Sequence, residues 1–176
     1  MKKNLSIKSV VALTVICLVT ALALSLVNYF TSPIIEKNEQ EKENEALRRV
    51  LPSGDEFSSL DIGSMGLDER ITAVYRAENG EGYVFKLTVK GYKSGMTILC
   101  GIGADGKVDG AVCLSSSETL GHEKTYGDRF DGKDISSVGG VDTVSGATKT
   151  TSAYREAVRL SLEAFNIIEN REEAEA

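Results

Sequence analysis

Residues 96–114 read MTILCGIGADGKVDGAVCL, two apolar runs separated by a short polar segment. Asp105-Gly106 lies between these runs, and an Asp-Gly pair flanked by alternating apolar residues is a strong hairpin signal. Glycine adopts the backbone angles that such a tight turn requires. The stretch therefore predicts two antiparallel strands joined by a short turn.

The register of this hairpin fixes the positions of two cysteines. With Asp105-Gly106 as the central turn residues, Cys100 faces Ala111 and Cys113 faces Ile98. The two cysteines are then diagonal neighbours on one face of the sheet, near the upper limit of disulfide reach. We expect two buried thiols, because free cysteine packs well at apolar strand positions. A disulfide is the open alternative outside the cell.

A second hairpin and a terminal helix complete the predicted domain. Residues 71–77 and 83–90 alternate in polarity on either side of a glycine-containing turn. From Thr151 or Ser152 onward, apolar residues recur at helical spacing, which predicts an amphipathic helix with one buried face. The fold class is therefore α+β, with antiparallel hairpins packed against helices.

The N-terminal part carries a long apolar segment. No charged residue occurs from Val10 to Phe30, and at ~1.5 Å per residue this run reaches about 31 Å, close to the thickness of one hydrocarbon core. Lys2, Lys3 and Lys8 precede it, so we expect a cytoplasmic N-terminus and an extracytoplasmic C-terminal domain. The alternative is a cleaved signal peptide. The length of the run, and the lack of a small-x-small cleavage site before Pro33, favour an anchor.

The sequence thus divides into an anchor, a connecting helix and one domain. Charged and amide residues after the anchor predict a polar helix that stops before Pro52, because the residue before a proline avoids the helical region. The expected divisions are a cytoplasmic N-terminus at 1–9, a transmembrane helix at 10–30, a polar helical stalk at 31–51, the domain at 52–170 and a frayed tail at 171–176.

Composition excludes several functions. The net charge of −6 argues against nucleic acid as a partner. The only histidine, His122, lacks the second histidine of a metalloprotease helix, and no spacing of Cys and His indicates a metal site. Asp142, Glu118 and His122 do not form a hydrolytic dyad or triad. We therefore find no complete active site, and enzymatic activity of the chain alone stays an open question.

Residues 142–152, DTVSGATKTTS, are rich in small and hydroxyl side chains directly before the terminal helix. The start of a helix leaves backbone N–H groups unpaired and carries partial positive charge, so it favours a phosphate. Gly146 and Ala147 allow close approach to the backbone. An ordinary helix cap with nothing bound is the alternative. The hydroxyl residues at this place are Ser145, Thr148, Thr150 and Thr151.

The order Asp-x-x-Ser-Gly-Ala-Thr in this stretch resembles the flavinylation motif of the FMN-binding domain family. That family includes the G subunit of Rnf electron-transport complexes and the C subunit of sodium-pumping NADH:quinone reductases. The resemblance implies FMN joined through its phosphate to Thr148, as a phosphoester made by a separate flavin transferase. Thr150 is the weaker candidate for attachment. Ser145, Gly146, Ala147 and Thr151 would then surround the phosphate.

A polar loop at 115–123 carries a second resemblance. Ser117-Glu118-Thr119-Leu120-Gly121 is similar to a Ser-Glu-Thr-Pro-Gly segment that lines the flavin in the Rnf G subunit, with Leu120 where proline is usual. The resemblance implies that Glu118 and Thr119 lie near the flavin ring. A polar surface turn is the alternative.

The resemblance implies an electron-relay function. The short chain is more similar to the Rnf G subunit than to the quinone-reductase C subunit, and Rnf complexes pass electrons between ferredoxin and NAD while moving ions. The other Rnf subunits are the expected partners, because this chain has too few cysteines for an iron–sulfur cluster. Two alternatives remain: a free-standing anchored flavoprotein that serves extracellular acceptors, and a non-redox anchored binding ectodomain.

Overall fold

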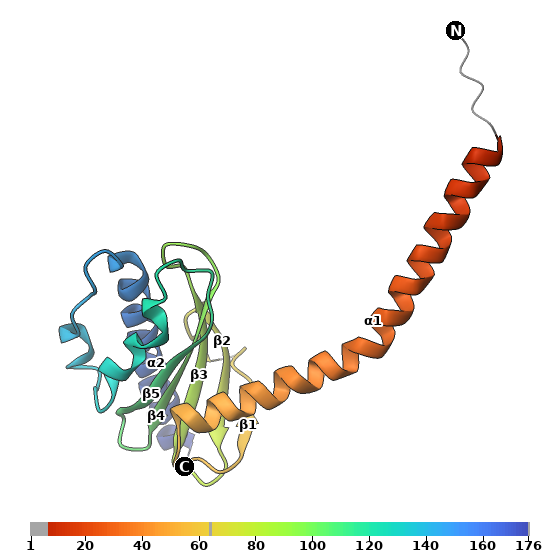
Figure 1. The fold of residues 1–176 in the computed structure, drawn as a ribbon. Helices are drawn as coiled ribbons and strands as arrows, with labels where there is room; N and C mark the ends of the chain where they lie inside the picture. Colours follow the sequence, from red (N-terminus) through yellow and green to blue (C-terminus); the bar gives the residue numbers. More distant parts are fainter. Residues whose placement is uncertain (1–6, 64, 176) are drawn as a thin grey trace. The chain divides into compact units, whose positions relative to one another are not determined.

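The computed structural model describes residues 7–63 and 65–175 (Figure 1). The chain forms two compact units, residues 1–43 and 44–176. Two α-helices and five strands make up the regular structure of the described residues: α1 Ile7–Val50, β1 Phe57–Ser59, β2 Ile71–Ala77, β3 Gly82–Val89, β4 Met96–Gly103, β5 Val108–Ser115 and α2 Thr148–Glu175. Three short 3-10 helices lie between β5 and α2: η1 His122–Lys124, η2 Tyr126–Phe130 and η3 Val138–Gly140.

The first unit consists of the larger part of helix α1. Its segment Ser9–Tyr29 has a mean hydropathy of 2.8 and is long and apolar enough to cross a membrane. The hydroxyl groups of Thr14 and Thr20 donate to the carbonyl oxygens one turn earlier, at 3.0 Å. These bonds satisfy two hydroxyls that would otherwise cost free energy in a hydrocarbon environment. This unit is consistent with a membrane anchor.

The sheet of the second unit is an antiparallel meander in the order β1-β2-β3-β4-β5. Both predicted hairpins are present, and Cys100 pairs with Ala111 while Cys113 pairs with Ile98, as predicted. The register shifts on either side of these pairs, between Thr97 and Ile98 and between Gly101 and Ile102. Strand β1 was not predicted. It is a three-residue edge strand whose side chains are mostly exposed, so it has no polarity pattern to detect.

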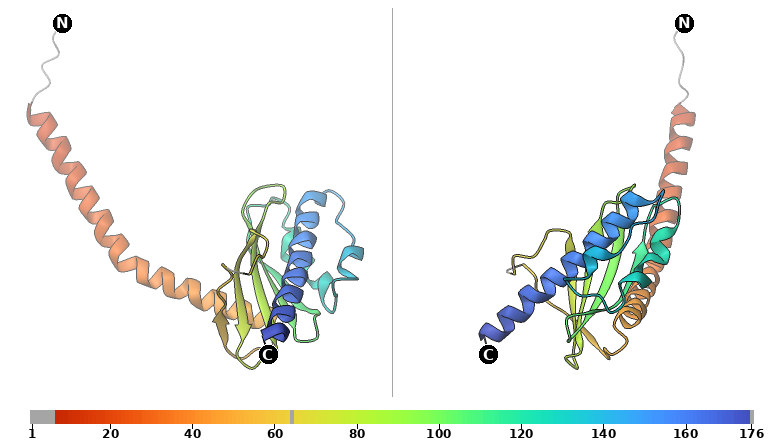
Figure 2. Two further views of the ribbon diagram at one scale, coloured as in Figure 1. Left: turned by 180° about the vertical axis from the view of Figure 1, so that it is seen from behind. Right: turned by 90° about the vertical axis from the view of Figure 1, so that its left-hand side faces the viewer.

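Two layers cover the two faces of the sheet. Helix α2 packs on one face, where Phe85, Ile98 and Tyr154 belong to the main core (Figure 2). The last turns of α1, within residues 44–50, pack on the opposite face. There Leu47 and Val50 join a smaller core with side chains of β2, β3 and β4. Burial of apolar side chains on both faces stabilises the sheet.

The boundaries of helix α2 differ from the sequence prediction. The helix begins at Thr148, earlier than the expected Thr151 or Ser152. It also continues to Glu175, into the segment 171–176 for which we expect fraying. Glu172 explains part of this extension, since it accepts hydrogen bonds from Tyr83 Oη at 2.9 Å and from Arg76 at 3.1 Å. These contacts tie the last turns of the helix to the sheet.

The two cysteines of the sheet are both free thiols. Cys100 is fully buried, as expected, and desolvation raises its pKa to about 12. Cys113 is only half-buried, so the expectation of two buried thiols is wrong for this residue, because strand β5 is the outer strand of the sheet. Desolvation, assisted by the charge of Glu123, raises the pKa of Cys113 to about 11.

These thiols should differ in reactivity. In a Cys17→Ser background, we expect Cys113 in the native protein to react with a maleimide roughly ten-fold faster than Cys100, because only an accessible thiolate is nucleophilic. Both raised pKa values keep the thiols neutral at pH 8, so both rates should increase from pH 8 to pH 10. Time-resolved mass spectrometry of labelled peptides gives the rates. Equal rates for the two thiols would contradict the burial described here.

Candidate functional site

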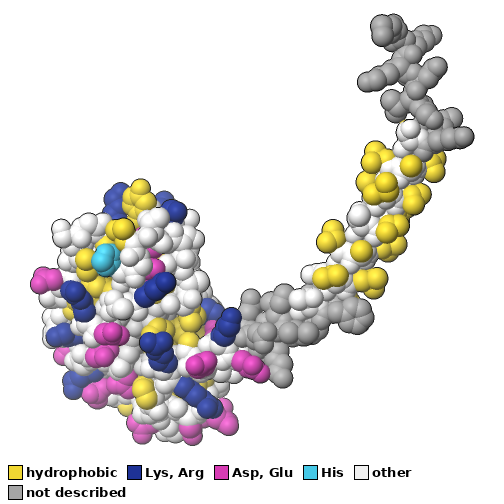
Figure 3. Space-filling view, viewed as in Figure 1, with side chains coloured by type: hydrophobic (Ala, Val, Ile, Leu, Met, Phe, Trp, Pro, Cys, Tyr) yellow, Lys and Arg dark blue, Asp and Glu magenta, His cyan; other side chains and the backbone are white. Residues whose placement is uncertain are grey.

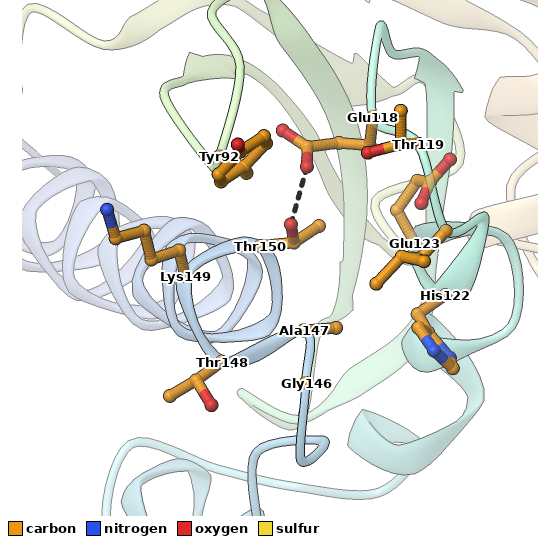
Figure 4. Close-up of a pocket in the computed structure, with 11 residues that line it drawn as sticks. Tyr92, Glu118, Thr119, His122, Glu123, Gly146, Ala147, Thr148, Lys149 and Thr150 are labelled. Atoms are coloured by element: carbon orange, nitrogen blue, oxygen red, sulfur yellow. Dashed lines mark hydrogen bonds between the residues drawn. The ribbon is translucent and has the colours of Figure 1, made fainter.

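A pocket of about 420 Å³ lies beside the first turn of helix α2 (Figure 4). Its volume is within the range of small-molecule sites. Three segments form its walls: the loop between β3 and β4, the loop that follows β5, and the start of α2. The lining residues are Tyr92, Glu118, Thr119, Leu120, His122, Glu123, Gly146, Ala147, Thr148, Lys149 and Thr150.

The turn before α2 brings the chain into the helix at Thr148. Gly146 has a φ of 83°, a left-handed conformation that favours glycine. The N–H of Ala147 donates to the carbonyl of Val144 at 3.0 Å and closes the turn. The first N–H groups of a helix have no partner within it, so the pocket wall at this point has the properties of an anion site.

Thr151 and Ser145 do not line the pocket. Thr151 is fully buried, and its hydroxyl donates to the carbonyl of Ala147 at 3.0 Å and accepts from the N–H of Val144 at 3.1 Å. Its hydroxyl therefore holds the turn together. Ser145 is exposed and lies outside the pocket wall. The structure therefore leaves these two predicted site residues out of the pocket wall, although Thr151 contacts Ala147 of that wall through its hydroxyl.

Glu118 connects all three walls. Its Oε2 accepts a hydrogen bond from the buried hydroxyl of Thr150 at 2.6 Å, drawn as a dashed line in Figure 4. Its Oε1 accepts from the backbone N–H of Lys93 at 2.8 Å. A Cβ atom at Gly91 would lie 2.6 Å from that same oxygen, so the chain has a glycine where the carboxylate needs space.

Thr148 differs from Thr150 in its surroundings. It is exposed at the pocket, and within residues 7–63 and 65–175 its hydroxyl has no hydrogen-bond partner. The next residue, Lys149, has its Nζ 6.0 Å from the centroid of the Tyr92 ring, within the range of a cation–π contact. Thr148 is thus the hydroxyl at this helix start that is free to form a bond to a ligand.

Apolar side chains lie at the rim. Tyr92 and Leu120, which both line the pocket, are 64% and 63% exposed. Figure 3 shows hydrophobic side chains gathered around the single histidine, His122, which also lines the pocket. The rim can therefore contact a flat apolar group while the helix start contacts an anion.

Glu123 is the one buried acidic residue of the wall. It is 3% exposed, and its Oε1 accepts a hydrogen bond from Ser116 Oγ at 2.8 Å. Its Oε2 is buried and has no partner among the described residues.

Six of the eight predicted site residues line the pocket, namely Glu118, Thr119, Gly146, Ala147, Thr148 and Thr150. Sequence reasoning missed the other lining residues, which are Tyr92, Leu120, His122, Glu123 and Lys149. A signal existed for Leu120, His122 and Glu123, because they belong to the predicted polar loop at 115–123. Tyr92 lies in a loop distant in sequence, and only the fold brings it to the site.

Comparison with known proteins identifies two regions of the chain. The FMN-binding domain model matches residues 91–163, which include every residue that lines the pocket, and the RnfG N-terminal region model matches residues 1–50. The chain therefore contains an FMN-binding domain and an RnfG N-terminal region.

Three relatives of this chain are G subunits of membrane complexes. The G subunit of the Na⁺-translocating ferredoxin:NAD⁺ oxidoreductase complex of Acetobacterium woodii is 29% identical, over 87% of this chain and 88% of the relative. Its counterpart in the proton-translocating ferredoxin:NAD⁺ oxidoreductase complex of Clostridium ljungdahlii is 26% identical, over 86% of each chain. The G subunit of the ion-translocating oxidoreductase complex of Shewanella piezotolerans is also 26% identical, over 94% of this chain and 92% of the relative.

The residues of the pocket fit FMN. The molecule has a phosphate, a hydroxylated chain and a flat ring with polar edges. The start of α2 suits the phosphate, exposed Tyr92 and Leu120 suit a ring face, and the unpartnered Oε2 of Glu123 suits a hydrogen-bond donor.

Proposed function

We propose that this chain is the FMN-carrying electron-relay subunit of an Rnf-type ion-translocating complex. The names of the relatives, the two family matches and the apolar helix support this function. The observation that carries the proposal is the free hydroxyl of Thr148 at the start of α2, beside a pocket whose lining lies within the FMN-binding match.

The proposed attachment is a phosphoester between Thr148 Oγ1 and the phosphorus of FMN, made by a separate flavin transferase. The Thr148 hydroxyl loses its proton and attacks the phosphorus of an activated flavin nucleotide held by the transferase. The new P–O bond forms as the bond from phosphorus to the leaving group breaks, and the product has the mass of the protein plus FMN less one water. Thr150 is a poor attachment site, because its hydroxyl is buried and donates to Glu118 at 2.6 Å. The geometry therefore favours Thr148 over Thr150.

Bound FMN would supply the redox chemistry, and the protein would hold and surround it. Thr148 fixes the phosphate end, and Gly146 leaves space for it at the helix start. Glu118 holds the three walls in one arrangement through Thr150 and the backbone of Lys93. A covalent bond prevents loss of the cofactor, which matters for a domain outside the cytoplasm.

We further propose that Ser9–Tyr29 anchors the chain with its N-terminus in the cytoplasm and the FMN-binding domain on the opposite side. Three lysines at positions 2, 3 and 8 support this orientation. The partners proposed are the other subunits of the Rnf complex and, during maturation, the flavin transferase.

Production of the full chain with and without an active flavin transferase tests the proposed function. We expect a flavin-fluorescent band on a denaturing gel only when the transferase is present, because only a covalent adduct survives denaturation. A known transferase substrate made in the same cells serves as the positive control. A non-fluorescent chain alongside a fluorescent control would reject the proposal.

A further inference from the structure

Glu123 is a buried acid that the attachment chemistry does not use. It lies in η1, directly after the loop that carries Glu118 and Thr119, and Figure 4 shows it on the wall between Thr119 and His122. Acidic side chains are rarely this buried without a partner for each oxygen. Its burial therefore needs an explanation.

Only one of the two carboxylate oxygens of Glu123 has a hydrogen-bond partner among the described residues. Ser116 donates to Oε1, whereas Oε2 has no donor, and within the described residues Glu123 forms no salt bridge. The half-buried thiol of Cys113 lies close enough to Glu123 to interact with it electrostatically. This thiol is not a cation and does not neutralise the carboxylate. An acceptor with a free lone pair in a pocket wall is suited to a ligand that brings a hydrogen-bond donor.

Glu118 is the other acidic residue of the pocket wall, and its hydrogen bonding differs from that of Glu123. Both of its oxygens already accept hydrogen bonds, from Lys93 N–H and Thr150 Oγ1, so it has a structural role. Glu123 is therefore the carboxylate in this pocket with capacity for the cofactor.

On the basis of the proposed function, we infer that Glu123 Oε2 accepts a hydrogen bond from FMN and that its negative charge lowers the reduction potential of the flavin. The donor is an N–H or O–H of the cofactor. A negative charge in the wall of a half-closed pocket disfavours the addition of electrons to a neighbouring group, and the low local dielectric strengthens this effect. Glu123 is then a determinant of affinity and potential, separate from the covalent bond.

Two measurements on Glu123→Gln test this inference. The substitution keeps the size of the side chain but removes the charge and replaces one acceptor by a donor. In full chain purified without the transferase, we expect FMN, added as the probe, to bind about ten-fold more weakly than to wild type, as followed by flavin fluorescence. In flavinylated chain, we expect a more positive midpoint potential in a spectroelectrochemical titration.

Two controls separate charge from packing. Asp128→Asn removes an exposed carboxylate outside the pocket and should change neither quantity. Ser116→Ala breaks the hydrogen bond to Glu123 but keeps its charge, so the potential should stay close to that of wild type. If Glu123→Gln does not fold, Glu123→Asp replaces it, since it withdraws the carboxylate by one methylene and should also weaken FMN binding.

Each outcome decides between the two proposals. Weaker binding and a raised potential, confined to the Glu123 variants, support the inference. Wild-type binding and potential in Glu123→Gln, or wild-type binding in Glu123→Asp if the first variant does not fold, overturn it and leave the proposed function intact. A wild-type chain that takes up no FMN with or without the transferase rejects the proposed function itself.

Discussion

We expect Thr148→Ala to abolish the proposed covalent flavin adduct completely and Thr148→Ser to retain it. Alanine lacks the hydroxyl that forms the proposed phosphoester, while serine supplies one at the same exposed position at the start of α2. Flavin fluorescence on a denaturing gel, together with intact mass of each variant from cells with active transferase, measures the result.

Thr150→Ala is the matched control for this prediction. It removes a hydroxyl two residues away that is buried and bound to Glu118. We expect the adduct to form, in lower yield, because one of the bonds that holds the pocket walls together is lost. An adduct that survives Thr148→Ala but disappears in Thr150→Ala would show that the attachment residue is wrong, while the flavin function would stand.

Gly101→Ala should lower the free energy of unfolding by about 3 kcal/mol, at the upper end of the usual range for overpacking. Gly101 in β4 pairs with Gly110 in β5, and the end of α1 lies directly on this pair. A Cβ atom at Gly101 would lie 2.1 Å from the carbonyl oxygen of Val50, a distance that no backbone contact tolerates. The end of the helix must therefore move away from the sheet.

Pulse proteolysis of the full chain in a urea series measures this loss of stability. Gly140→Ala is the control, because a Cβ atom there meets nothing within 4 Å and its φ is not in the left-handed region. A Gly101→Ala midpoint equal to that of Gly140→Ala would show that the end of α1 does not pack on the sheet as described.

Local patterns predicted the parts of the fold that depend on neighbours in the sequence. Asp105-Gly106 located the β4–β5 hairpin and gave the correct partners of both cysteines, although the register shifts between Gly101 and Ile102 on the way to the turn. Local patterns gave no correct prediction where contacts between residues distant in the sequence determine the structure. Strand β1 exists through pairing with β2, and the last turns of α2 are held by Tyr83 and Arg76, which no local pattern around Glu172 indicates.

The candidate site shows the same division. The residues at the start of α2 and in the Ser-Glu-Thr loop were identified from motifs, and six of those predicted line the pocket. The motif does not show which hydroxyl groups already form hydrogen bonds within the protein. The hydroxyl of Thr151 closes the turn before α2, and that of Thr150 donates to Glu118. Nor could it show Tyr92, which reaches the pocket from the β3–β4 loop.

Peptide mapping of the native protein tests the central claim most directly. Trypsin cuts after Lys133, Lys149 and Arg155, so Thr148 falls in peptide 134–149 and Thr150 in peptide 150–155. From membranes with active transferase, we predict the mass of FMN less one water on peptide 134–149, placed on Thr148 by fragment ions, with peptide 150–155 unmodified. If the flavin blocks the cut after Lys149, the fragment ions of peptide 134–155 give the same assignment. Recovery of both peptides unmodified would contradict the account.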